Sequence, residues 1–290
     1  MHEAGASRLN LRLEFGMGMR VVGAVALVVC AAVALGQAAS AQDGQAALQD
    51  ELEKLGVAAQ SLQRDLPSFS CTETGLSQAL KKGKVKAQVR FVAEVRVERA
   101  AGGRLDEELN VTEVNGKRPK DRFEPPFMVG GGFGESLFYF LPATQACFQY
   151  ALSSSQNDTK QGRIDFVSPP GTFDRPQCRH TGAPDGFVLF DDAGNPTHLE
   201  RRVPHEFAEQ MHVVDFSAMD FTATELDGQV YPLTAKMVAD EAKEDGVTLH
   251  FEAVYTGCHL FKATSWILPG ETWFRMRESR ILEREYECVG

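Results

Sequence analysis

The sequence lacks the motifs that mark the commonest catalytic sites. It contains no Gly-x-Ser-x-Gly elbow, no Cys-x-x-Cys pair and no His-Glu-x-x-His zinc motif. Acid pairs such as Glu107-Glu108 fall on what we expect to be a solvated strand face, and the histidines are interpreted as surface residues. We therefore expect no enzymatic activity, no cofactor and no metal site.

Positive charge is also in short supply. Lys and Arg number 30 against 40 Asp and Glu, which gives a formal net charge of −10. Nucleic-acid binders depend on Lys and Arg to neutralise phosphates. Basic residues alternate with acidic ones wherever they are dense, so we exclude a nucleic-acid partner.

No apolar run reaches the roughly 20 residues that a membrane-spanning helix needs. The run Val21–Leu35 follows Arg20 and precedes Ala39-Ser40-Ala41, which is the order of a secretory signal cleaved after Ala41. We expect residues 1–41 to be a signal peptide with a misassigned start, and the protein to be periplasmic or secreted. The alternative is an inner-membrane anchor formed by residues 21–35.

Cysteine is scarce, with six residues in all, of which five follow the expected cleavage site. Export would place these five in an oxidising compartment, where disulfides persist. Because five is odd, at least one thiol stays free or pairs between chains. We expect the pairs Cys71–Cys258 and Cys147–Cys178.

One apolar stripe at helical spacing is present near the N-terminus. Leu48, Leu52, Leu55, Ala59, Leu62 and Leu66 recur at intervals of three and four residues. This predicts a helix over Gln45–Leu66, ended by Pro67 and packed on a sheet, within an N-terminal segment 42–67.

Period-two alternation dominates the rest. From Val85 to Val97 every odd position is apolar while all but one of the even positions are polar, which predicts a long strand with its whole odd face buried. Gly102-Gly103 turns the chain into a partner strand, Arg104–Asn115. Alternation and turn signals place the other strands at 68–78, 147–152, 163–167, 186–191, 197–203, 211–225, 229–239, 247–255 and, after a turn at Gly257, 260–268.

The predicted fold class is mainly β (α+β). About ten or eleven strands would form a curved antiparallel half-barrel over residues 68–270. A brief apolar helix over Glu135–Leu141, stopped by Pro142, would act as a lid. The charged C-terminal extension 271–290 is expected to hold a terminal helix.

This order of elements resembles the LolA and LolB proteins of periplasmic lipoprotein localisation. Their fold is an unclosed antiparallel barrel with helices as a lid, and its inner face takes acyl chains. Residues 69–268 also look like a group of secreted acidobacterial proteins of unknown function, with similarity at Phe69–Cys71, Glu113–Lys117, Gly131–Leu137, Gly228–Leu233 and Cys258–Ala263.

The resemblance implies a non-enzymatic protein that binds a lipid, a lipoprotein acyl chain or another apolar ligand in a half-barrel cavity. Residues suited to lining that cavity are Phe91, Val95, Phe133, Leu137, Phe251, Tyr255 and Trp266, although sheet interiors need the same residues as ordinary core. The glycines Gly130, Gly131, Gly132 and Gly134 suit a hinge for the lid better than a phosphate-binding loop, since the Lys-Ser/Thr of a P-loop is missing.

Two other functions stay open. The protein could be a structural or protein-interaction module of the cell envelope without a small-molecule pocket, and an envelope protein would then be its partner. A hydrolase comes third, and a cleft holding two carboxylates, or a His beside a Ser or Cys, would favour it. Cavity volume and co-purification with lipid separate the first two.

Overall fold

The computed structural model describes residues 44–100, 105–119, 123, 125–134, 136–153, 161–179, 181–211, 213–261 and 274–275. The chain divides into two units, Met1–Ala46 and Ala47–Gly290. Residues 44–64 are helical, and the features below belong to the second unit. The predicted signal peptide lies outside the described residues. No helix within the described ranges is long and apolar enough to cross a membrane.

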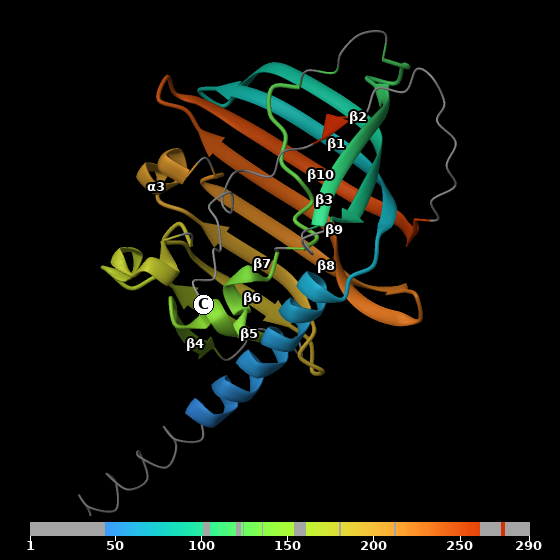
Figure 1. Ribbon diagram of the computed structural model, residues 1–290. Coiled ribbons are helices and arrows are strands. Elements are labelled where there is room, and N and C mark those ends of the chain that lie inside the picture. Colours follow the sequence, from blue (N-terminus) through green and yellow to red (C-terminus); the bar gives the residue numbers. More distant parts are fainter. Residues whose placement is uncertain are drawn as a thin grey trace, which may run out of the picture. The chain divides into compact units, whose positions relative to one another are not determined.

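Eleven strands of the described chain form one antiparallel sheet in the order β11-β3-β2-β1-β10-β9-β8-β7-β6-β5-β4. The edge strands β4 and β11 do not pair with each other, and the sheet is curved (Figure 1), which confirms the mainly-β, unclosed half-barrel. The strands are β1 (Phe69–Lys81), β2 (Lys84–Arg99), β3 (Leu105–Val114), β4 (Gln149–Ser153), β5 (Gly162–Val167), β6 (Asp185–Phe190), β7 (Pro196–Arg202), β8 (Phe216–Leu226), β9 (Gln229–Ala242), β10 (Val247–Leu260) and β11 (Phe274–Arg275).

Two sequential meanders, β1–β3 and β4–β10, make up most of the sheet. They meet where β1 pairs with β10, in a register that places Glu73 opposite Tyr255. The disulfide Cys71–Cys258 crosses this seam, and a second disulfide joins Cys147 to Cys178. Both pairings predicted from the sequence are confirmed.

Two-residue turns join several strands. Asp227-Gly228 and Lys82-Gly83 both have positive φ at each position, as a tight hairpin turn requires. The first turn was predicted. The second shows that β1 is a full partner of β2 and ends at Lys81, whereas the sequence interpretation ended it at Gln78.

One face of the sheet, called the inner face below, carries the core. It includes Phe91, Val95 and Val97 of β2, and the leucine stripe of helix 44–64 belongs to the same buried cluster. The prediction that the whole odd side of β2 is buried is wrong at the hairpin tip, where Val85 is 50 % exposed and Ala87 is also exposed. Burial begins only at Phe91 because the tip extends beyond the core.

The predicted lid helix differs from the observed one. Phe138–Phe140 forms a short 3-10 helix, η1, and Pro142–Gln145 forms α2. Pro142 therefore begins a helix instead of stopping one, which suits a residue without an N–H at the first helical position. Two further 3-10 turns, η2 (Thr172–Asp174) and η3 (Pro176–Cys178), lie in the turn-rich stretch before β6.

Three other predictions from the sequence were wrong: the start of β8, the turn at Gly257 and the helix expected near the C-terminus. Residues His205–Met211 form helix α3, so β8 begins only at Phe216. Gly257 is not a turn, because β10 continues through it to Leu260 and accommodates it where the register with β1 shifts between Ser70 and Thr72. Residues 262–268 lie outside the described chain. Phe274–Arg275 pairs with β3 as a strand, which contradicts a helix there, and the rest of 271–290 is outside the description.

Candidate functional site

The residues predicted to line a cavity lie together on the inner face. Phe91 and Val95 come from β2, and Phe251 and Tyr255 come from β10. Phe133 and Leu137 come from the chain between β3 and β4, and none of the six is more than 4 % exposed. They form part of one core, while Trp266 lies outside the described residues. That they line a ligand cavity stays a prediction.

A covering segment, residues 125–134 and 136–148, crosses the inner face on the same side as helix 44–64 (Figure 1). Near its start the Phe127 amide donates to Ser77 Oγ of β1 at 2.9 Å, and the Phe127 ring packs edge-on against Phe251. Further along, a methyl group on Gly132 would lie 3.4 Å from the Met219 side chain of β8. The segment thus spans both meanders.

Glu107 of β3 holds the glycine-rich end of the covering segment. Its carboxylate accepts the Gly131 amide at 2.7 Å through Oε2 and the Phe133 amide at 3.1 Å through Oε1. Hydrogen bonds to an ionised acceptor are stronger than neutral ones. The predicted solvated position of Glu107 is therefore wrong, because the side chain is only 3 % exposed. Glu107 lies two residues from both Leu105 and Leu109, which are buried on the same side of β3. This alternation could have revealed that Glu107 is buried.

The glycines permit close approach at this point. A Cβ on Gly130 would lie 2.9 Å from Glu107 Oε2, and one on Gly131 would lie 2.5 Å from the Phe133 ring. Gly132 has a φ of +63°, which L side chains rarely adopt. These close approaches and the positive φ explain why glycine occupies these positions in this structure. That the stretch acts as a hinge stays a prediction.

Phe133 is the apolar anchor of the same end. Its ring is fully buried and lies edge-on to Phe69 at 5.2 Å and to Tyr255 at 5.0 Å between centroids. Such T-shaped pairs are favourable beyond the area they bury. The ring therefore occupies the space between β1 and β10 on the inner face.

Glu73, a residue that the sequence interpretation missed, is buried on β1 opposite Tyr255. Neither carboxyl oxygen of Glu73 nor the Tyr255 hydroxyl has a hydrogen-bond partner in the described structure. Burial, reinforced by the Glu107 charge, raises the pKa of Glu73 to about 8. Glu73 is therefore protonated at neutral pH. Burial, followed by Glu73 and Glu107, also raises the pKa of Tyr255.

The other end of the covering segment is held by paired groups. Arg201 of β7 donates through Nε to Ser217 Oγ at 2.7 Å and through Nη1 to Tyr139 Oη. The Tyr139 ring stacks on Phe166 of β5 with centroids 5.2 Å apart. Tyr150 Oη donates to the Tyr139 carbonyl at 2.5 Å, and the pKa of Tyr150 is raised by burial.

Helix 44–64 rests on this second end. Gln145 donates from Nε2 to the carbonyls of Phe140 at 2.9 Å and Leu52 at 3.3 Å. A Cβ on Gly56 would lie 3.2 Å from the Phe140 carbonyl oxygen. Cys147, tied to Cys178, follows directly. The second end is thus fixed by a disulfide, a helix and an arginine.

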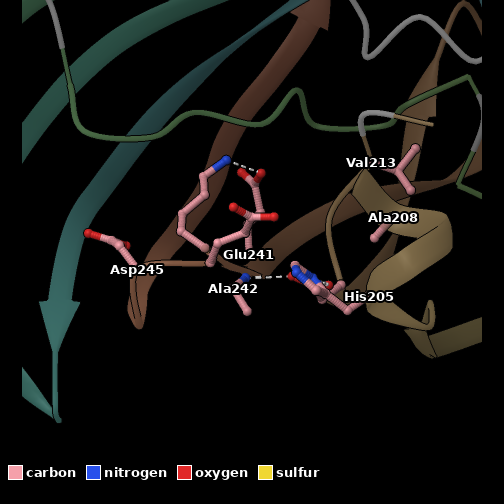
Figure 2. Close-up of a pocket in the computed structure, with 9 residues that line it drawn as sticks. His205, Ala208, Val213, Glu241, Ala242 and Asp245 are labelled. Atoms are coloured by element: carbon pink, nitrogen blue, oxygen red, sulfur yellow. Dashed lines mark hydrogen bonds and ion pairs between the residues drawn. The ribbon is translucent and has the colours of Figure 1, made fainter. Parts of the chain in front are cut away.

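A separate polar pocket of about 320 Å³ opens between α3 and the end of β9 (Figure 2). Asp215 accepts from His205 Nδ1 at 2.8 Å and from the Ala242 amide, and Glu241 pairs with Lys243. His205 is solvent-accessible, as predicted for a surface histidine. His198 and His250 each lie 2.7 Å from a strand aspartate.

A metal-binding cluster of three or more His, Cys, Asp or Glu is absent from the part of the chain that the structure describes. His180 and His212 lie outside those residues. The pocket of Figure 2 is accordingly a solvated, charged recess, and the inner face with its covering segment is the stronger candidate for a functional site.

Comparison with known proteins returns similar solved structures. No protein-family model and no curated protein matches the sequence. A LolA superfamily protein from Nitrosomonas europaea shares 10% identity at a TM-score of 0.33, with 74% of this chain and 94% of that chain covered. A domain described as an outer membrane lipoprotein-sorting protein, from Vibrio parahaemolyticus, shares 9% at a TM-score of 0.41, with 76% and 94% covered.

A DUF1329 family protein from Desulfovibrio piger shares 10% identity at a TM-score of 0.38, with 75% of this chain and 95% of that chain covered. All three structures are similar to this chain at 9 to 10% identity, with TM-scores below 0.5. At this level of similarity the likeness concerns the fold, and what the protein binds has to be argued from its own residues.

Proposed function

We propose that the inner face binds an apolar ligand, either a lipid or a lipoprotein acyl chain, beneath the covering segment. The protein would act in the periplasm or as a secreted protein, without catalysing a reaction. The two disulfides support a location outside the reducing cytosol. The driving force would be burial, at roughly 0.8 kcal/mol for each methylene group removed from water.

The single observation that carries the proposal is that the two ends of the covering segment differ in how well the polar groups beside them are hydrogen-bonded. Phe133 of its glycine-rich end packs on Tyr255, which lies opposite Glu73 in the β1–β10 pairing. The Glu73 carboxyl oxygens and the Tyr255 hydroxyl have no hydrogen-bond partner within the described residues. Each such group costs about 1–3 kcal/mol when buried. Lifting this end would relieve that cost and would vacate the space that Phe133 fills between Phe69 and Tyr255.

Movement would then be confined to one end. Gly130, Gly131, Gly132 and Gly134 would serve as the hinge, while the disulfide Cys147–Cys178 keeps the second end in place. The ligand would contact the same aromatic side chains that now contact Phe133. The alternative, a structural or protein-interaction module of the envelope, requires no such opening.

Native mass spectrometry of the protein purified from its own cell envelope tests the proposal. We expect a co-purifying lipid that is released on denaturation and lost in Phe251→Asp. Val254→Asp is the matched control, since Val254 lies on the same strand but on the outer face, 39 % exposed. Circular dichroism verifies that both variants are folded. A ligand-free wild-type protein that also takes up no fluorescent fatty acid would favour the structural module.

A further inference from the structure

The turn between β1 and β2 concentrates positive charge. It holds four lysines, namely Lys81, Lys82, Lys84 and Lys86. No acidic residue occurs between Glu73 and Glu94, so this stretch is an exception to the sequence interpretation that basic and acidic residues alternate wherever they are dense. In a chain with a net charge of −10, it is a local reversal of sign. Residues Lys81–Lys86 are called the lysine tip below.

The lysine tip extends beyond the core. Every residue from Lys81 to Gln88 is exposed, and burial on β2 begins only at Phe91. At about 3.3 Å per residue, the turn lies roughly 25 Å along the strand from that first buried side chain. β3 ends at Val114, opposite Phe91, so no described strand borders β2 on that side at the tip. The tip can therefore contact a surface without disturbing the core.

The turn itself does not require lysine. Lys82 has a φ of +52°, a left-handed conformation that favours Gly, Asn and Asp. The β8–β9 turn has positive φ at Asp227 and Gly228, which are residues that suit this geometry. Lys81 also lies directly opposite Lys84 in the β1–β2 pairing, where like charges are destabilising. Two unfavourable features thus coincide at one turn, and neither is needed to form it.

The protein neutralises only part of this charge itself. The neighbouring β9–β10 turn carries Asp245, whose carboxylate lies 3.6 Å from Lys81 Nζ. Lys82, Lys84 and Lys86 form no ion pair with any residue that the structure describes. Three ammonium groups are therefore available to an external anionic partner.

Apolar groups accompany the lysines. Val85 stands between Lys84 and Lys86 and is 50 % exposed, and Ala87 is also exposed. Lysine stems can lie along apolar material while their ammonium groups stay in water. An anionic bilayer offers head-group phosphates to the ammonium groups and an apolar layer to the valine. A soluble polyanion offers only the phosphates or sulfates, and bidentate recognition of those groups favours arginine, which the tip lacks.

We propose that the lysine tip docks the protein on an anionic phospholipid bilayer. Val85 enters the head-group layer, and Lys82, Lys84 and Lys86 lie beside the lipid phosphates. Because the whole chain is negatively charged, an anionic surface repels it in general, and only a local positive feature can hold it there. The inference goes beyond the function proposed above and does not depend on a ligand beneath the covering segment.

Co-sedimentation of the purified protein with lipid vesicles tests the inference. Vesicles of phosphatidylcholine alone are compared with vesicles of phosphatidylcholine and phosphatidylglycerol in about equal amounts. We expect binding to the mixed vesicles only, and binding that weakens as salt is added, because salt screens exposed charges. Circular dichroism verifies that each variant is folded.

Charge reversal at the tip is the main variant. Lys82→Glu combined with Lys84→Glu should weaken binding to the mixed vesicles by at least about 25-fold, since each lysine near an anionic surface contributes about five-fold. Lys84→Glu places opposite charges across the β1–β2 pair, so it should not weaken the fold. Arg64→Glu combined with Arg179→Glu is the matched control, because it changes the net charge equally at exposed positions elsewhere. The control should bind as wild type does.

A second pair of variants tests the apolar contribution. Val85→Ser should weaken binding by about five-fold, because the side chain no longer gains from leaving water. Val230→Ser is the matched control, since Val230 is 66 % exposed on the β8–β9 hairpin, which carries no lysine. This control should leave vesicle binding unchanged.

Several results would overturn the inference. They are absence of wild-type binding, equal affinity for both kinds of vesicle, and equal loss in the tip variant and the arginine control. Wild-type binding by the tip variant would also overturn it, because the lysines would then only keep the free edge of β2 from pairing, which glutamate does as well.

A soluble polyanion is the remaining outcome. Binding that depends on the lysines but not on Val85, with heparin in solution as effective as the vesicles, would assign the tip to such a partner and overturn the bilayer proposal. Phe251→Asp should bind the mixed vesicles as wild type does. Failure of the inner-face proposal would therefore leave this result in place.

Discussion

The two ends of the covering segment are held in opposite ways. At residues 131–133 one carboxylate accepts two amides, above a carboxyl and a phenol that lack partners within the described chain. At residues 138–148 the hydroxyls of Tyr139 and Thr144 are paired, the Tyr139 carbonyl accepts from Tyr150 of β4, and Cys147 forms a disulfide. The second end is therefore a permanent attachment, whereas the stability of the first depends on how its buried acids are satisfied.

The largest effect that would sharpen this contrast concerns Glu73. The folded protein retains a proton on Glu73 up to about pH 8, while the ordinary pKa is 4.5. The contribution of protonated Glu73 to the free energy of unfolding is therefore complete below pH 4.5 and is lost as pH rises through about 8. We expect the free energy of unfolding to fall by an amount on the order of 5 kcal/mol over this window.

Glu73→Gln should flatten that dependence and make the protein more stable than wild type at pH 8. Urea denaturation between pH 4.5 and pH 8 measures both effects. Glu113→Gln is the control and should follow the wild-type curve. Parallel curves for wild type and Glu73→Gln would show that Glu73 titrates normally and that the first end carries no strain from it.

The next effect concerns the second end of the covering segment, residues 138–148. Replacing Cys147 and Cys178 by serine opens a link between residues 31 positions apart, and the chain-entropy relation predicts a loss of about 4 kcal/mol in stability. Hydrogen exchange should accelerate at residues 138–148 and remain unchanged at 131–133. Faster exchange at both ends to the same degree would mean that they open as one unit.

A smaller effect is expected at the glycine-rich end. Glu107→Gln replaces a carboxylate by a neutral amide, so one of the two backbone donors loses its acceptor. We expect a loss of about 2 kcal/mol in the free energy of unfolding and faster exchange of the Gly131 and Phe133 amides. Residues 138–148 should keep wild-type exchange. Unchanged protection at residues 131 and 133 would show that Phe133 packing alone holds this end.

The smallest effect is expected at Tyr139. Tyr139→Phe removes the hydroxyl that accepts from Arg201 but keeps the ring on Phe166, and Arg201 still donates to Ser217. We expect a loss of about 1 kcal/mol, measured by urea denaturation. A loss as large as that of Glu107→Gln would mean that the two ends are held equally through polar contacts.

Periodicity in the sequence predicted most of the sheet. The alternation over Val85–Val97 and the turn at Asp227-Gly228 are local signals. The structure has the strand and the turn, although burial on the odd side of the strand begins only at Phe91. The leucine stripe likewise predicted the helix. These elements could be predicted because each depends on residues within a few positions of one another.

The polar part of the candidate site could not be predicted in the same way. Hydropathy alone places a glutamate in water, although the parity of Glu107 with Leu105 and Leu109 marks the inner face. The amides that its carboxylate accepts, of Gly131 and Phe133, lie 24 and 26 residues away, and no local pattern links them to it. Glu73 was missed for the same reason, although its parity with Phe69 and Cys71 marks the inner face. Pro142 and Gly257 were interpreted as breaks because local propensity does not register tertiary packing.

The seam between β1 and β10 has a consequence for how the protein is made. Within each meander every strand pairs with the next strand along the chain. β1, in contrast, must wait for residues up to Leu260 before its second neighbour exists. Closing such a long loop slows folding. Until then β1 is an unpaired edge, and unpaired edges are where strands of different molecules join. Aggregation during biogenesis is therefore most probable before β10 emerges, however stable the finished sheet is.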